Sequence, residues 1–214
     1  MLVKFHTMKS LRYPITSALV DGGFNYLEFV QFTEQLVGEN CTTGPNQSEE
    51  YLAYTRMCLQ RMVRWNKTSK VSKELAQLMR RVNRPQVWLL ITEAWCGDGA
   101  QSIPHLAKLA DLSPNIMLKI VLRDEHPDLM DAYLTKGNRS IPKLIAMTVD
   151  FQNELFVWGP KPKYLINRHA AFKQNSEGRS YSDFLEEVHL WYAKNKQKDL
   201  ESEIYPLISS TLIP

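Results

Sequence analysis

The segments Val87-Trp-Leu-Leu-Ile91 and Trp95-Cys96-Gly97-Asp98-Gly99 decide the fold of this chain. The first is a short apolar run typical of a buried strand, and a helical pattern from Ala100 to Ala110 follows the second. Cys96 is therefore expected where a strand gives way to a helix. The first turn of a helix leaves N–H groups unpaired and carries the positive end of the helix dipole. Such a position can lower the pKa of a thiol from about 8.5 to roughly 3.5–7.5.

The surroundings of Cys96 resemble the thioredoxin superfamily. Pro104 stands eight residues after the cysteine, where thioredoxins carry a proline that kinks the helix. The segment Ser140-Ile-Pro-Lys-Leu-Ile-Ala-Met147 is similar to the start of the thioredoxin hairpin, whose proline is cis, and Glu154–Gly159 matches the partner strand. The resemblance covers about residues 85–198. It implies an α/β, thioredoxin-like fold, in which a central mixed sheet is flanked by helices.

The sequence departs from the family at the reactive motif. Gly99 stands where the second cysteine of Cys-x-x-Cys belongs, so the site is monothiol and cannot close an internal disulfide. Asp98 replaces the usual proline, and its charge is expected to raise the pKa of Cys96, against the helix dipole. We interpret Asp98 as a helix cap, in preference to a local proton carrier or a plain polar residue of a turn. Leu90 occupies the position where thioredoxins bury a carboxylate that assists proton transfer.

The resemblance implies a site around Cys96 as the catalytic residue. Trp95, expected to shield the sulfur or simply to pack, joins Gly97 and Asp98 as expected substrate-binding residues. Ile141 and Pro142 match the pair that offers backbone groups to a bound peptide or to glutathione. The expected partner is a thiol- or disulfide-bearing protein or glutathione, which would be a co-substrate, with no resident cofactor.

Two functions remain open for this site. The first is monothiol thiol–disulfide exchange through Cys96, in which an external thiol resolves the mixed disulfide. The alternative is a non-catalytic thioredoxin-fold module that binds a peptide or protein, with Cys96 a small buried apolar side chain. A peroxidase is disfavoured, because Thr92 lies four residues before the cysteine rather than three.

Net charge and apolar content limit the kinds of partner and location that are expected for this protein. The 214 residues carry a net charge of +3, too small to indicate a nucleic-acid partner. We interpret the basic excess between Lys67 and Arg84 as a solvated helix face. No apolar run approaches the ~20 residues of a membrane span, and no secretion signal is recognised, so no membrane partner and a cytoplasmic location are expected.

The other cysteines and histidines offer no second site. Cys41 lies in an expected loop and is better placed than Cys58 to reach Cys96, although a role for it is not favoured; Cys58 is expected to be buried. His105 is about 180° round the helix from Cys96, which disfavours a Cys–His pair. Arg123-Asp-Glu-His126 is interpreted as a polar loop, and no metal site is expected.

The chain divides at Pro85. Residues 1–84 are predicted to form an N-terminal helical extension docked on the core, and residues 85–214 the thioredoxin-like domain. A first strand of that domain either lies within residues 1–15 or is absent. Residues 160–181 are expected to be a long connection folded over the sheet edge. The predicted helices are 24–38, 48–65, 72–84, 96–112, 128–136 and 182–196, and the predicted strands are 87–92, 117–122, 143–149 and 154–158.

Overall fold

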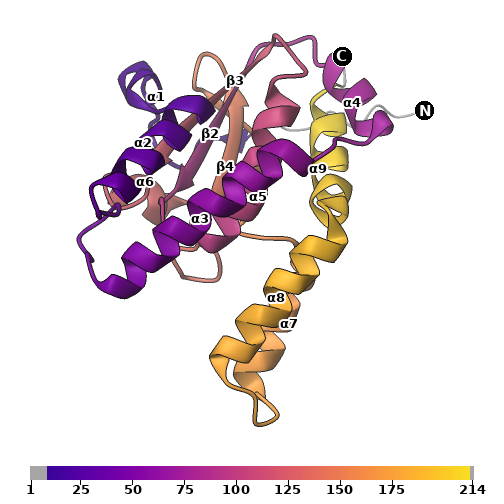
Figure 1. Cartoon of the computed structure of the whole chain (residues 1–214). Helices are drawn as coiled ribbons and strands as arrows, with labels where there is room; N and C mark the ends of the chain where they lie inside the picture. The colour runs from indigo at the N-terminus through magenta and orange to yellow at the C-terminus, as the bar shows by residue number, and fades with distance from the viewer. Residues whose placement is uncertain (1–8, 213–214) are drawn as a thin grey trace.

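Residues 9–212 are described by a computed structural model, in which a five-stranded mixed sheet lies between two layers of helices (Figure 1). The strand order is β1-β5-β4-β2-β3, with β2 parallel to β3 and every other neighbouring pair antiparallel. This arrangement confirms the α/β architecture expected from the sequence. The strands are β1 (Lys9–Ser10), β2 (Gln86–Thr92), β3 (Ile116–Leu122), β4 (Lys143–Thr148) and β5 (Asn153–Trp158).

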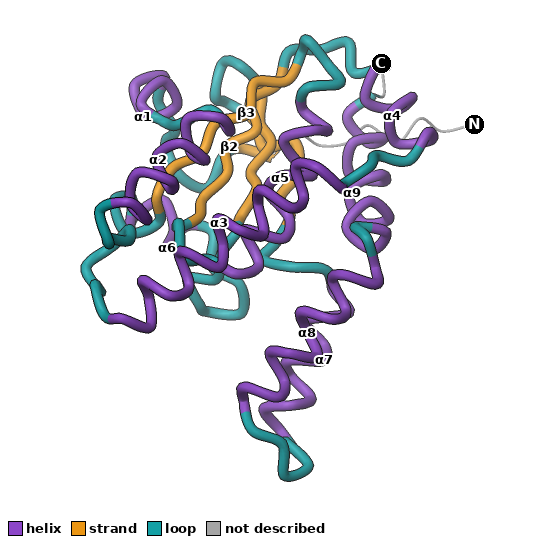
Figure 2. The backbone as a smooth tube through the Cα atoms, in the orientation of Figure 1, coloured by secondary structure: helices purple, strands orange, loops and turns teal. Residues whose placement is uncertain are grey.

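The helices cover both faces of this sheet (Figure 2). Their bounds are α1 (Ser17–Gly22), α2 (Tyr26–Gly38), α3 (Glu49–Thr68), α4 (Lys73–Arg80), α5 (Gly97–Ala110), α6 (Pro127–Ala132), α7 (Lys163–Gln174), α8 (Tyr181–Asn195) and α9 (Lys198–Thr211).

Strand β2 is the centre of the structure, because all seven of its residues are buried. Successive side chains of a strand point to opposite faces, so β2 supplies two separate cores. Trp88 and Leu90 pack with residues of α2, α3, α4, α5 and α9. Val87, Leu89 and Ile91 pack with residues of α1 and α6 on the other face. The end of this rigid strand fixes the position of the cysteine turn that follows it.

The segment before residue 85 contributes a strand to the same sheet and helices to the layers that cover it. β1 pairs antiparallel with β5, so the sheet has a strand within the predicted range 1–15, of which residues 1–8 lie outside the described part. The sheet therefore has five strands, namely the four predicted ones and this first strand. Helix α2 starts with a capping box formed by Asn25 and Glu28, and α3 packs along α5. The division between residues 84 and 85 stays a prediction.

The prediction for residues 160–181 was wrong. They include α7, which packs against α8 through Phe172 and Phe184, whose ring centroids are 4.4 Å apart. The two helices form a hairpin, residues 163–195, that projects from the sheet domain (Figure 1). Only Leu165 of α7 is fully buried, which explains why its apolar periodicity was not recognised. Helices α1 and α9 were also missed, and α6 ends at Ala132 instead of residue 136.

Among residues 9–212, no helix combines the length and apolar character needed to cross a membrane.

Candidate functional site

Cys96 is the N-cap residue of α5, at the junction that the sequence predicts. Its Sγ accepts a hydrogen bond from the Gly99 N–H at 3.3 Å and donates its own proton to the Ile141 carbonyl at 3.5 Å. The Ile141–Pro142 peptide bond is cis, as the resemblance implied. The structure thus brings the segment before β4 directly to the sulfur.

Burial dominates the electrostatics of the Cys96 thiol. The residue is only 5% exposed, and burial followed by the Asp98 charge raises the pKa of Cys96 to about 12. The Gly99 N–H, the Thr92 hydroxyl and Lys161 act in the opposite direction and do not offset it. From the sequence, only the helix terminus and Asp98 were expected to act on this pKa; desolvation, which disfavours any charged form, adds to the effect of Asp98. The resting thiol is therefore protonated at neutral pH.

Asp98 forms a small polar cluster with the hairpin. Its carboxylate pairs with Lys161 Nζ at 2.5 Å and accepts a hydrogen bond from the Tyr192 hydroxyl at 2.8 Å. The interpretation of Asp98 as a helix cap was wrong, because the Cys96 sulfur itself takes the Gly99 N–H. Lys161 and Tyr192 are far from Asp98 in sequence, so local spacing could not show these partners.

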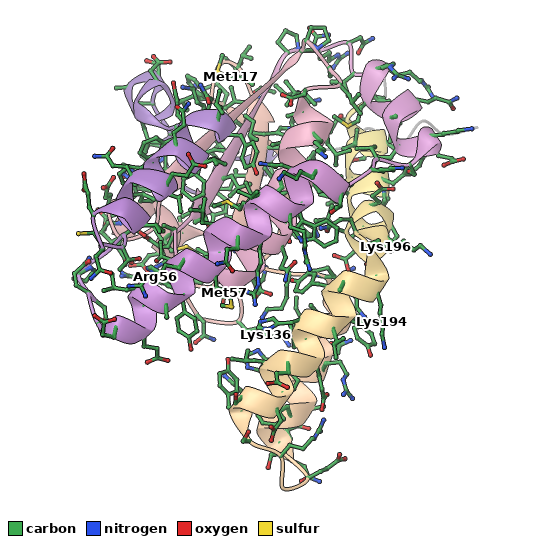
Figure 3. All side chains as sticks on the ribbon, in the orientation of Figure 1. Arg56, Met57, Met117, Lys136, Lys194 and Lys196 are labelled. Atoms are coloured by element: carbon green, nitrogen blue, oxygen red, sulfur yellow. The ribbon has the colours of Figure 1, made fainter. Side chains whose placement is uncertain are left out.

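A cavity of about 510 Å³ opens beside the sulfur. Its walls come from α3, the turn at residues 95–98, the loop at residues 138–141, and the α7–α8 hairpin. Trp95 forms part of the wall, with its ring 5.0 Å from that of Tyr51 and 4.8 Å from the guanidinium of Arg123. Met57, labelled on α3 in Figure 3, also lines the cavity. Of the predicted site residues, Trp95, Cys96, Gly97, Asp98 and Ile141 line this cavity, whereas Pro142 is buried and does not line it.

Arg61 and His189 connect α3 to α8 across the cavity. Arg61 Nη2 lies 2.8 Å from His189 Nε2. A guanidinium has no acceptor, so the imidazole accepts through Nε2 and carries its own proton on Nδ1. Burial and the Arg61 charge lower the pKa of His189 to about 4, so this histidine is neutral at pH 7.

A family model described as Thioredoxin matches residues 44–173, more than half of the chain. The chain belongs to the thioredoxin family. Two solved structures share its fold: an HIV epitope scaffold, 18% identical with a TM-score of 0.54, and a protein of unknown function from Pseudomonas aeruginosa, 17% identical with a TM-score of 0.56. Each similarity covers 92% of this chain, and 96% and 95% of the other chain respectively. No curated protein matches.

Neither of the other two cysteines of this thioredoxin-family chain lines the cavity. All three cysteines are free, and Cys58 is fully buried, as expected. His105 bonds to Ser69 Oγ at 2.6 Å and to Glu201 Oε1 at 2.9 Å, in a network that ties α5 to the end of α3 and to α9. It does not face the Cys96 sulfur, in agreement with the helical-wheel argument. Within residues 9–212, no group of acidic, histidine or cysteine side chains could hold a metal ion.

Four polar residues of the candidate site were not predicted from the sequence. Arg61, Lys161, His189 and Tyr192 come from α3 and from the segment around the hairpin. None stands in a recognisable motif with Cys96. The only available signal was the concentration of aromatic and cationic residues between 160 and 192, which the loop interpretation set aside.

Proposed function

We propose that this chain carries out monothiol thiol–disulfide exchange through Cys96, with an external thiol as the resolving partner. One observation supports it most: Cys96 lines a ligand-sized cavity together with Ile141, whose carbonyl its sulfur contacts, while position 99 holds no side chain. A cavity lined by this cysteine offers an external disulfide a place to bind next to it. With glycine at 99, only a thiol from outside can complete the cycle.

The exchange consists of two balanced steps. In the first, the Cys96 sulfur attacks one sulfur of a disulfide R–S–S–R, a Cys96–S–S–R bond forms, and the S–S bond of the substrate breaks. The departing thiolate R–S⁻ is then protonated, which balances the proton that Cys96 lost. In the second, an external thiol attacks the mixed disulfide and releases R–S–S–R′ and the Cys96 thiol. No net redox equivalent is left on the protein.

Proton loss from Cys96 controls the rate of the first step, because the thiolate is the nucleophile. The raised pKa of Cys96 leaves little thiolate at neutral pH. Lys161 and the Gly99 N–H stabilise that thiolate, whereas Asp98 opposes it. The reaction is therefore expected to be slow at pH 7 and to accelerate with pH.

The same burial favours a second candidate function. A protonated sulfur that is 5% exposed and donates to a backbone carbonyl behaves as a structural group. In that case the chain is a non-catalytic module that holds a peptide or protein at the cavity lined by Cys96 and Ile141.

Alkylation of the folded protein by iodoacetamide, followed by peptide mapping of each cysteine, separates the two functions. For thiol exchange, Cys96 reacts more slowly than a peptide cysteine at pH 7, and its rate rises about tenfold per pH unit to beyond about pH 9. Exchange with a small disulfide follows the same profile, and Cys96→Ser abolishes it. Cys96 that stays unmodified at about pH 9 in the folded protein, while urea exposes it to reaction, supports the binding module and contradicts thiol exchange.

A further inference from the structure

We propose that the cavity beside Cys96 binds a small anionic thiol or disulfide, whose carboxylate pairs with Arg61 while its sulfur lies against Cys96. The sulfur part rests on the proposed function. The anion part rests only on the charges and the shape of the cavity.

The cavity wall carries more positive charge than its acidic neighbours neutralise. Five lysine and arginine side chains line it, against the single carboxylate of Asp98. Three of the five form ion pairs. Among residues 9–212, neither Arg61 nor Lys173 has a carboxylate oxygen within 4.0 Å. The paired cations are Lys161 with Asp98, Arg123 with Asp124, and Arg139 with Asp131.

Arg61 is the cation best placed to hold a ligand. Its Nη1 lies 3.4 Å from the point where a Cβ would stand on Gly97, the residue after Cys96. Its guanidinium is partly buried, and burial lowers the pKa of Arg61. The neutral His189 accepts only one of its five N–H groups. A partly buried cation with unused donors favours an anionic partner, and the planar fork of arginine matches a carboxylate.

The positive charges of the cavity wall also act on two histidines of the hairpin, His169 and His189. Burial, then Lys161 and Lys173, lower the pKa of His169, and Arg61 contributes to the low pKa of His189. Both side chains line the cavity and would be neutral at pH 7. These histidines therefore add no positive charge of their own, and the hairpin residues that line the cavity include no carboxylate to neutralise the lysines and arginines.

The dimensions favour a small molecule over an extended peptide. A volume of about 510 Å³ lies within the usual range of small-molecule sites, roughly 300–1,000 Å³. Tyr181 and Phe184 of α8 form a second wall in addition to Tyr51 and Trp95. Apolar faces of this kind suit the carbon chain of a ligand whose ends are sulfur and carboxylate.

Three disulfides of similar size and different charge test the proposal: dithiodipropionate with two carboxylates, neutral hydroxyethyl disulfide, and cystamine with two ammonium groups. The rate of adduct formation on Cys96 is measured by mass spectrometry at low ionic strength and divided by the rate for a peptide cysteine. We expect dithiodipropionate to react at least about tenfold faster than cystamine on this scale. Arg61→Gln should remove this preference, because it removes the guanidinium charge and keeps a polar side chain. Arg56→Gln, on the same helix but bonded to Asn40 outside the cavity, is the matched control and should keep it.

Calorimetric titration of Cys96→Ser with dithiodipropionate separates anion binding from thiol exchange. Binding that weakens at least about tenfold with added Arg61→Gln supports the inference, even if wild-type Cys96 forms no adduct with any disulfide. Adducts that form with no charge preference overturn the inference and leave the proposed function intact. Tight binding of an extended peptide without binding of the small dianion also overturns it.

Discussion

The substitution Gly99→Cys restores the Cys-x-x-Cys spacing and tests the geometry of the turn most closely. A Cβ built on residue 99 would lie 3.3 Å from both the Cβ and the Sγ of Cys96. Disulfides usually hold their Cβ atoms about 3.5–4.5 Å apart, so a small outward shift is enough to join positions 96 and 99. The new Cβ would also lie 2.7 Å from Thr92 Oγ1, which is too close for an undisturbed side chain.

These contacts set the magnitude of the effect. Thr92 is fully buried, so it has little room to move, and overpacking of this kind costs about 1–3 kcal/mol. Closing a four-residue loop stabilises the protein by about 2 kcal/mol in the chain-entropy model. We therefore expect the reduced variant to be about 1–3 kcal/mol less stable than wild type, and the oxidised variant to regain most of that loss.

Urea unfolding of the reduced and oxidised variant measures both quantities, and an insulin reduction assay measures the gained activity. Gly99→Ser is the matched control, because it imposes the crowding without a second sulfur. Adding Thr92→Ala should relieve the crowding and give a favourable coupling of about 1 kcal/mol with Gly99→Cys. Cys96→Ser in the Gly99→Cys background should abolish reductase activity. If no bridge forms, with or without Thr92→Ala, the reasoning about this turn is refuted.

Three further predictions concern charge, pH and packing. Asp98→Asn removes the negative neighbour of Cys96, so the thiol pKa should fall by about one unit and alkylation at pH 8 should accelerate about tenfold; an unchanged rate would show that burial acts alone. The folded-state pKa of His189 is about 4 against 6.5 for a free histidine. The unfolded chain therefore binds more protons between these values, and the free energy of unfolding falls as pH drops from 6.5 to 4. Substitution His189→Gln, which keeps an acceptor for Arg61, should flatten this decline in urea titrations, and an equally steep decline would exclude His189 as its source. Leu106 is fully buried, so Leu106→Ala should cost about 2–5 kcal/mol in unfolding experiments, and a loss below about 1 kcal/mol would contradict the packing described.

The sheet and the cysteine turn were predictable because their signals are local. The apolar run of β2, the place of Cys96 between a strand and a helix, and the helical pattern of α5 occur within 25 residues, and each was confirmed. The short edge strand β1 has only two residues and both are exposed, so no alternation identifies it. Helix α7 was not predicted for a related reason, since only Leu165 of its 12 residues is fully buried.

Only the part of the candidate site around the cysteine turn and the segment before β4 was predictable from the sequence. Trp95, Cys96 and Ile141 come from segments with recognisable spacing, and the structure places all three on the cavity. The electrostatic environment depends on Lys161 and Arg61, which the fold brings in from distant elements. Burial of the sulfur likewise depends on the whole assembly of helices around it. A sequence pattern gives the identity of the thiol, whereas the tertiary structure sets its pKa.

Mass spectrometry of the native protein after incubation with oxidised glutathione, with fragmentation to locate the modification, tests monothiol exchange most directly. We predict one glutathione attached to Cys96, formed faster at higher pH and removed by an added thiol. Cys96→Ser should abolish the adduct at that position. A disulfide from Cys96 to Cys41 or Cys58 in good yield, or an unmodified Cys96 at alkaline pH, would contradict the account.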